Sequence, residues 1–284
     1  MRFRIRTTAI LLLLAVLLLS LSTIQIQAAS INNAADIACT VPRVLTSTLE
    51  GNSRYQESSL GSVVADAVRI SLSSDIAVIC GGELIGNLLP GEATYGEIRN
   101  VFAADRTIAA ATITVKELRG ILEAGLSHIT IDNTEQIDSE LSAFDGFPQI
   151  SGFVLYYDVS APPGERVSEI IINGESLDLE SVTRTITLAS TAHMLEGGYG
   201  FAPVKAISYS DLTLYDVTLQ YIRDGITEYS PSQQRLHEKG ANDGGALRYL
   251  AGYILPLLVV VFLVAYFSKT RNKNDLERET SPWY

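Results

Sequence analysis

Histidine and cysteine are scarce in this chain of 284 residues, which contains three histidines and two cysteines. A metal centre built on several histidines is therefore hard to assemble, and His128 and His237 have no neighbour at the spacing of metal ligands. The GxSxG, HExxH, CxxC and P-loop motifs are absent from the sequence as well. We therefore expect no metal, no cofactor and no catalytic residues, and we reject an independent hydrolase.

Basic side chains are few between residues 29 and 247, where 13 Lys and Arg stand against 29 Asp and Glu, a net charge of −16. A surface this acidic repels phosphate backbones at long range. We therefore expect no nucleic acid polymer as a partner. A local pocket can oppose the overall field, so the charge count leaves a small anionic ligand open.

Long apolar runs occur only near the two ends of the chain. At the N-terminus, three arginines within the first six residues precede an apolar run at 9–21, and small residues follow near Ala28. This order predicts a secretory signal over residues 1–28. An uncleaved N-terminal anchor is the alternative, although the run is short for a full membrane span.

The second apolar run covers residues 250–267, which are 18 residues without a charge. Its length is close to the ~20 residues that a bilayer core requires. Three basic residues follow at once, and the positive-inside bias places the tail at 268–284 in the cytoplasm and residues 29–247 outside. The sequence thus predicts a single-pass protein of the cell membrane, with the lipid bilayer as a partner.

Helical and strand patterns alternate between these two runs. Apolar residues recur at helical spacing in 58–73, 94–101, 115–127 and 212–223, and strand patterns occupy 40–49, 75–80, 107–112, 152–158, 167–172 and 184–189. Asn173 and Gly174 predict a hairpin turn. This order indicates an α+β architecture in which mixed sheets pack against helices.

Domain boundaries follow from the same patterns. We expect a lead-in at 29–41, a folded domain at 42–225 and a stalk at 226–247, because the last stretch combines Pro, Ser, Gly, Gln and charges of both signs without an apolar period. Cys39 and Cys80 both lie in the exported part, where thiols are commonly paired. One interpretation is a disulfide between them. The other is that each cysteine is a small buried apolar residue.

Short motifs are spread over the predicted domain in a characteristic order. They are RYQE at 54–57, LG at 60–61, ADA at 65–67, DIA at 75–77, a double glycine at 81–82, TYG at 94–96, SG at 151–152 and GGYGF at 197–201. Together they resemble the C-terminal domain of the 5'-nucleotidase family. The resemblance implies a domain that recognises a nucleoside and helps to hold its phosphate, while a separate metallophosphatase domain carries two metal ions and performs hydrolysis.

Residues 29–53 are too few to hold such a catalytic domain. The resemblance therefore implies a separately encoded metallophosphoesterase as a partner and a nucleotide or nucleoside as a ligand. An alternative hypothesis keeps the fold but not the ligand: a non-catalytic module that binds other molecules at the cell surface, because a fold can outlast its function.

The resemblance assigns three kinds of contact to residues of this chain. It implies that Arg54 reaches the substrate phosphate, with Gly81 and Gly82 in the loop that follows a strand. It implies that His193 stacks on the base, with Phe102 as the opposite wall only after a two-residue shift. Tyr199 occupies the position of an acidic residue that binds the ribose hydroxyls.

Several of these positions depart from the family pattern. The loop carries Cys80 and Ile85 where the family has Asn and Arg, and Glu83 adds negative charge, so we expect poor phosphate affinity there. Arg54 has the alternative role of a surface arginine or a partner of Glu57. His193 has that of an ordinary turn residue. For the last aromatic residue of the GGYGF motif, at position 201, we favour a core role.

Overall fold

The structure is a computed structural model that describes residues 33–49, 52–132, 137–229 and 233–239. The predicted signal at 1–28, the predicted membrane span at 250–267 and the tail at 268–284 lie outside these residues. Within the described ranges, no helix is long and apolar enough to cross a membrane.

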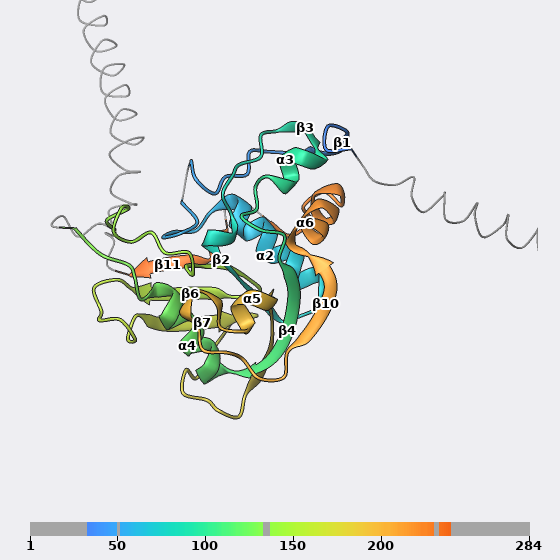
Figure 1. Cartoon of the computed structure of the whole chain (residues 1–284). Coiled ribbons are helices and arrows are strands. Elements are labelled where there is room, and N and C mark those ends of the chain that lie inside the picture. Colours follow the sequence, from blue (N-terminus) through green and yellow to red (C-terminus); the bar gives the residue numbers. More distant parts are fainter. Residues whose placement is uncertain (1–32, 50–51, 133–136, 230–232, 240–284) are drawn as a thin grey trace, which may run out of the picture.

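The described residues form a mixed α+β fold with three sheets (Figure 1), which confirms the predicted class. The strands are β1 (Ile37–Val41), β2 (Ile76–Cys80), β3 (Gly91–Thr94), β4 (Thr107–Thr114), β5 (Pro148–Ser151), β6 (Val154–Asp158), β7 (Val167–Ile172), β8 (Glu175–Ser176), β9 (Thr185–Thr191), β10 (Ser208–Thr213) and β11 (Leu236–Lys239). The helices are α2 (Ser59–Ser71), α3 (Tyr95–Arg99), α4 (Val115–Leu126), α5 (Ala192–Leu195) and α6 (Leu214–Arg223), with 3-10 turns η1 (Gly81–Glu83) and η2 (Gly198–Gly200).

The central sheet has the strand order β10-β4-β9-β2-β5. Strands β2 and β9 are parallel to each other, whereas all other neighbours in this sheet are antiparallel. A second sheet has the order β11-β6-β7-β8, and β1 pairs with β3 in a small third one. Asn173 and Gly174 both adopt left-handed backbone angles between β7 and β8, which confirms the predicted hairpin turn.

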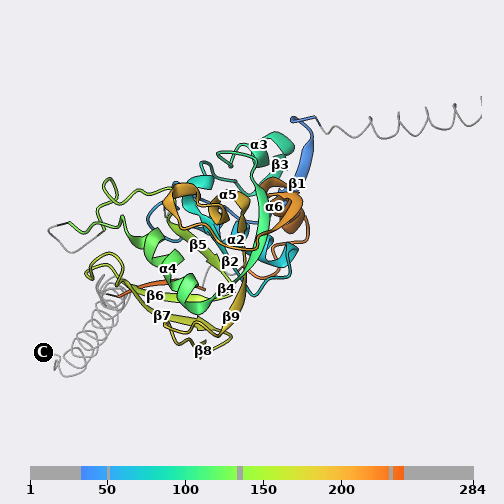
Figure 2. The same cartoon turned by 60° about the horizontal axis from the view of Figure 1, so that its bottom comes forward.

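Helices cover both faces of the central sheet and create two cores. On one face, α4 contacts β4, β5 and β7 and so lies against both larger sheets (Figure 2). On the other face, α2 packs against β2, β5, β9 and α6. Strand β2 serves both cores: Ile76 and Val78 face the first, and Ala77 and Ile79 the second. This double burial explains the unbroken apolar run at 76–80.

The helix starts follow the capping rules. The Ser58 hydroxyl accepts a hydrogen bond from the Gly61 amide at the start of α2. Capping boxes begin three other helices, with Thr94 and Glu97 at α3, Thr114 and Glu117 at α4, and Thr213 and Asp216 at α6.

Two sequence predictions about the N-terminal part need correction. Cys39 and Cys80 are free thiols, each buried in a different core, so the disulfide interpretation is wrong and the small-residue interpretation is right. The predicted strand at 40–49 coincides with β1 only up to Val41. After Pro42, Leu45 makes a single bridge with Leu88, because proline lacks the amide that would extend the ladder.

The predicted stalk at 226–247 is wrong for its described residues. Ile226 is buried beside α6, and β11 pairs in parallel with β6, so the chain returns to the domain instead of leaving it. The pattern rules missed this because only Leu236 of the strand is a buried apolar residue. Residues 240–247 lie outside the described part.

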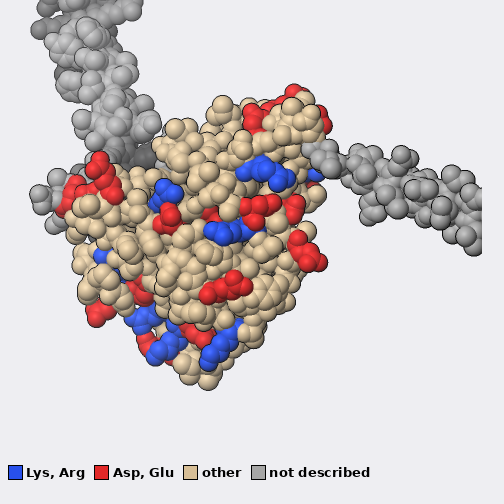
Figure 3. Space-filling view, viewed as in Figure 1, with Lys and Arg blue, Asp and Glu red and all other residues tan. Residues whose placement is uncertain are grey.

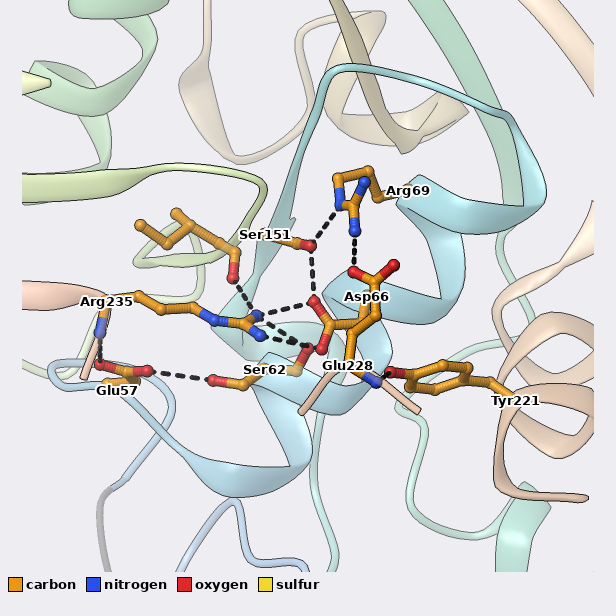
Figure 4. A network of polar contacts seen from close by, with 9 residues as sticks. Glu57, Ser62, Asp66, Arg69, Ser151, Tyr221, Glu228 and Arg235 are labelled. Atoms are coloured by element: carbon orange, nitrogen blue, oxygen red, sulfur yellow. Dashed lines mark hydrogen bonds and ion pairs between the residues drawn. The ribbon is translucent and has the colours of Figure 1, made fainter. Parts of the chain in front are cut away.

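Polar contacts hold this returning segment in place (Figure 4). The Arg235 guanidinium donates to Asp66 at 2.9 Å and to the carbonyls of Ser62 and Ile150. The Glu57 carboxylate accepts from the amides that begin β11. A buried ion pair of this kind fixes a specific arrangement, because each charge needs its partner once it has left water.

Candidate functional site

The candidate site lies where the two parallel strands of the central sheet end. The chain runs from β2 directly into η1 and from β9 directly into α5 and η2. Because parallel neighbours end at the same edge of a sheet, this edge brings the loop at 81–83 close to the loop at 193–200. Ligands of sheets with parallel strands commonly bind outside such carboxyl ends.

The two glycines of η1 are required by close packing. A Cβ atom on Gly81 would lie 1.7 Å from the Ser53 carbonyl oxygen, and one on Gly82 would lie 2.4 Å from the Asp145 Cβ. Their amides donate to the carbonyls of Phe147 and Asp145, both at 2.8 Å. These glycines therefore seat two other segments of the chain against the loop, and their amides already have acceptors.

Arg54 lies beside this loop and forms an ion pair with Asp145. Its Nε is 2.8 Å from Oδ1 of Asp145, and the two side chains are 40% and 50% exposed. The alternative pairing with Glu57 is wrong, since that carboxylate accepts from the Ser62 hydroxyl and the Arg235 amide. Arg54 thus stays at the surface of the site with its charge partly neutralised.

Glu83 is the buried charge of the loop. Its carboxylate is fully buried, and Arg106 Nε lies 3.3 Å from Oε2. Among the described residues, Oε1 finds no hydrogen-bond partner. Burial raises the pKa of the Glu83 carboxyl above its ordinary value, and the nearby Arg106 charge opposes this rise. A buried acceptor without a donor costs about 1–3 kcal/mol, so this atom is an exception that needs an explanation.

His193 and Tyr199 form the opposite side of the cluster. Their rings meet edge to face with centroids 5.0 Å apart. Tyr199 has a φ of 56°, a strained left-handed conformation for a tyrosine, between two flanking glycines. Its hydroxyl interacts with both Glu83 and Arg106, and burial together with the Glu83 charge raises the pKa of that hydroxyl.

The two phenylalanines of the sequence prediction belong to the cores. Phe102 is buried in the second core, where it makes a backbone bridge with Leu84, and Phe201 is buried in the first. The core role of Phe201 is therefore confirmed. The structure brings Arg54, the two glycines, His193 and Tyr199 to one end of the sheet, whereas the Phe102 side chain is packed away among apolar neighbours.

Sequence reasoning missed Arg106 and Asp145, which supply the counter-charges of this site. A signal existed for the first: Glu83 follows a fully buried strand, and a buried carboxylate requires a cation. No comparable signal pointed to Asp145, because 91 positions separate it from Arg54 in the sequence. Across the described ranges, no group of three or more His, Cys, Asp or Glu side chains is placed to hold a metal ion.

Comparisons with known proteins bear on this geometry. The family model described as "5'-nucleotidase, C-terminal domain" matches residues 31–206. Two curated proteins of Bacillus subtilis (strain 168) are similar: the trifunctional nucleotide phosphoesterase protein YfkN, 26% identical over 56% of this chain and 10% of its own length, and the endonuclease YhcR, 29% identical over 61% and 13%. The aligned part of this chain thus corresponds to roughly a tenth of these relatives.

Solved structures show the same architecture. A 5'-nucleotidase precursor from Thermus thermophilus superposes with a TM-score of 0.62 at 19% identity, over 73% of this chain and 40% of that chain. A putative 5'-nucleotidase from Staphylococcus aureus gives a TM-score of 0.60 at 16% identity, over 72% and 41%. At this level of identity, the superpositions establish the fold.

Proposed function

Because this chain belongs to the 5'-nucleotidase C-terminal domain family, we propose that its folded domain binds the nucleoside part of a nucleotide or nucleoside outside the cytoplasmic membrane. The predicted helix at 250–267 would anchor it there as a single-pass protein. In the family, this domain is the substrate-binding part of nucleotidases. Hydrolysis would belong to a separately encoded metallophosphatase, to which the domain presents the ligand.

One observation carries this proposal. The family resemblance selects positions 54, 81–82, 193 and 199. The residues at these positions lie together at the carboxyl ends of β2 and β9. Three segments distant in the sequence thus meet at the place where such sheets hold ligands.

The aromatic pair supplies the recognition chemistry. A base offers a flat π face, and the rings of His193 and Tyr199 provide partly exposed surfaces that can stack on it. The packing of Gly198 against the imidazole restrains that ring, since a Cβ there would lie 2.4 Å from Nε2. The domain would therefore contribute orientation of the ligand rather than bond cleavage.

A second candidate function is a surface-binding module without nucleotide affinity. The pairing of Arg54 with Asp145 favours it, because the arginine that would reach the phosphate already has a carboxylate partner. Titration calorimetry separates the two hypotheses. The full chain in lipid nanodiscs is titrated with adenosine, uridine and their 5'-monophosphates.

We expect micromolar binding of at least one of these ligands and a loss of about tenfold or more in His193→Ala, since one base stack contributes about 1–3 kcal/mol. The matched control is His237→Ala. The ring of this histidine also stacks on a tyrosine ring, that of Tyr156, with the centroids 4.6 Å apart. His237 lies on β11, however, and outside the site. Absence of binding by every ligand, or equal losses in the two variants, would contradict the proposal.

A further inference from the structure

The charges around the loop at 81–83 cancel in pairs. Asp145 lies 2.8 Å from Arg54, and Glu83 lies 3.3 Å from Arg106. These two cations and two anions together contribute no net charge. On the face shown in Figure 3, basic patches likewise lie beside acidic ones and form no continuous basic area.

The two carboxylates differ in how firmly they are held. Glu83 is fully buried on a short turn whose backbone is fixed by the carbonyl contacts of both glycines. The Glu83 carboxylate therefore cannot move away from Arg106 unless the loop moves as well. Asp145 is half exposed, yet its own backbone carbonyl accepts from the Gly82 amide, which keeps the residue beside the loop. Neither anion is therefore a mobile surface charge.

Other donors that commonly bind phosphate are also occupied. Glycine-rich loops bind phosphate through free backbone amides. Here the amides of Gly81, Gly82 and Ile85 donate to the carbonyls of Phe147, Asp145 and Val101. A phosphate at this loop would thus meet neutralised arginines, occupied amides and a buried carboxylate.

Each carboxylate lies within ion-pair distance of the Nε atom of its arginine, although the Arg54 Nε has no hydrogen-bond partner in the described chain. The terminal guanidinium nitrogens lie outside these two contacts and can donate hydrogen bonds, although Arg106 also interacts with the Tyr199 hydroxyl. The paired carboxylates offset the positive charge that would attract a dianion. Hydroxyl and carbonyl oxygens of a neutral ligand fit such donors well. A phosphate monoester, which carries about two negative charges at neutral pH, does not.

We propose that this site selects an uncharged nucleoside over its phosphorylated form, and that Glu83 and Asp145 determine this selectivity through the arginines that they neutralise. The inference rests on the proposed function and narrows it. In reaction order, the domain would hold the product of a phosphatase rather than its substrate. Glu83 and Asp145 are positioning residues in this scheme, since they act through Arg106 and Arg54.

Titration calorimetry of the full chain in lipid nanodiscs tests the selectivity, with adenosine and uridine each compared with its own 5'-monophosphate at low salt. For the unmodified chain, we expect the nucleoside to bind at least about tenfold more tightly than the monophosphate. Glu83→Gln and Asp145→Asn should each lower the preference for the nucleoside over its monophosphate by about tenfold, because each variant frees the positive charge of one arginine. Added salt should remove that change, because it is electrostatic.

Asp145→Asn keeps the test decisive if Glu83→Gln fails to fold, since Asp145 is half exposed. Glu175→Gln is the matched control: it also removes a carboxylate paired with an arginine, Arg184, but on the distant β8, and should change neither affinity. Monophosphates that bind as tightly as nucleosides would overturn the selectivity and leave the proposed function intact. If no ligand binds at all, the proposed function fails and this inference fails with it.

Discussion

Two buried carboxylates of this domain each face an arginine, and their surroundings differ. Asp66 accepts from Arg235 at 2.9 Å and from Ser151 at 2.6 Å, and that arginine also reaches two carbonyls. Glu83 has a contact of 3.3 Å to an arginine that is 35% exposed and an interaction with the Tyr199 hydroxyl, and its Oε1 has no hydrogen-bond partner within the described chain. A buried network in which every polar group has a hydrogen-bond partner stabilises a fold, whereas a network with an unpaired group destabilises it locally. The first cluster therefore holds the structure, and the second belongs to the site.

The largest expected effect tests the structural role of the first cluster. Arg235→Met removes the cation and leaves the Asp66 charge buried without compensation, which should lower the free energy of unfolding by about 3–5 kcal/mol. Urea unfolding of the full chain in nanodiscs, read by pulse proteolysis, measures it. The β11 amides should also lose protection in hydrogen exchange, because Arg235 directly precedes that strand.

Two controls accompany this variant. Arg184→Met breaks an exposed ion pair with Glu175 and should leave the unfolding midpoint almost unchanged. The double variant Asp66→Leu with Arg235→Met removes both charges together and should be more stable than Arg235→Met alone. If Arg235→Met shifted the unfolding midpoint no more than Arg184→Met does, the buried network would not hold the segment.

The next effect in size concerns the packing of the site. Gly81→Ala would place a Cβ atom 1.7 Å from a backbone oxygen of Ser53, which cannot give way as a flexible side chain can. We expect a loss of about 3 kcal/mol, at the upper end of the usual range for overpacking. Gly120→Ala is the control. It lies inside α4, where an added Cβ meets nothing within 4 Å, and should gain about 0.5–1 kcal/mol through helix propensity. Equal effects on the urea midpoint would contradict the close approach.

The elements that could be predicted from sequence are those with a strong local pattern. The apolar run that became β2, the amphipathic helices α2 and α4, and the turn at Asn173 all follow from periodicity or turn chemistry. Strands β5, β10 and β11 could not be predicted in this way. The first begins with Pro148 and the second is mostly exposed, while the third depends on an ion pair with a residue 169 positions away.

The site shows the same division between local and distant information. The family resemblance selected Arg54, His193 and Tyr199, and the sheet topology brings them to one edge. The partner of Arg54 stayed hidden because Asp145 stands 91 positions away in the sequence. The burial of Glu83 indicated a cation, but the sequence did not identify that cation as Arg106. The selectivity proposed above depends on these two pairs, so the most specific statement about function required the tertiary structure.

The smallest expected effect contrasts two carboxyl groups by their response to pH. Burial raises the pKa of Glu83, so between its ordinary value and the raised one the folded state binds the proton more tightly than the unfolded state. The unfolding free energy of the unmodified chain should therefore fall as pH rises through this window. Glutamine does not titrate, so the stability of Glu83→Gln relative to the unmodified chain should increase with pH across the window and then level off.

Asp75→Asn supplies the opposite sign. Hydrogen bonds from Thr187 lower the pKa of Asp75, so its contribution is present above the ordinary aspartate value and is lost as pH falls through the lowered pKa. As pH falls, the unmodified chain should thus lose its stability advantage over Asp75→Asn, whereas it should gain stability relative to Glu83→Gln. Urea midpoints from about pH 3 to pH 7 measure both differences. If the stability difference between Glu83→Gln and the unmodified chain stayed constant over this range, burial of the Glu83 carboxylate would not destabilise its charged form. The Glu83 and Asp66 clusters would then differ only in their contacts.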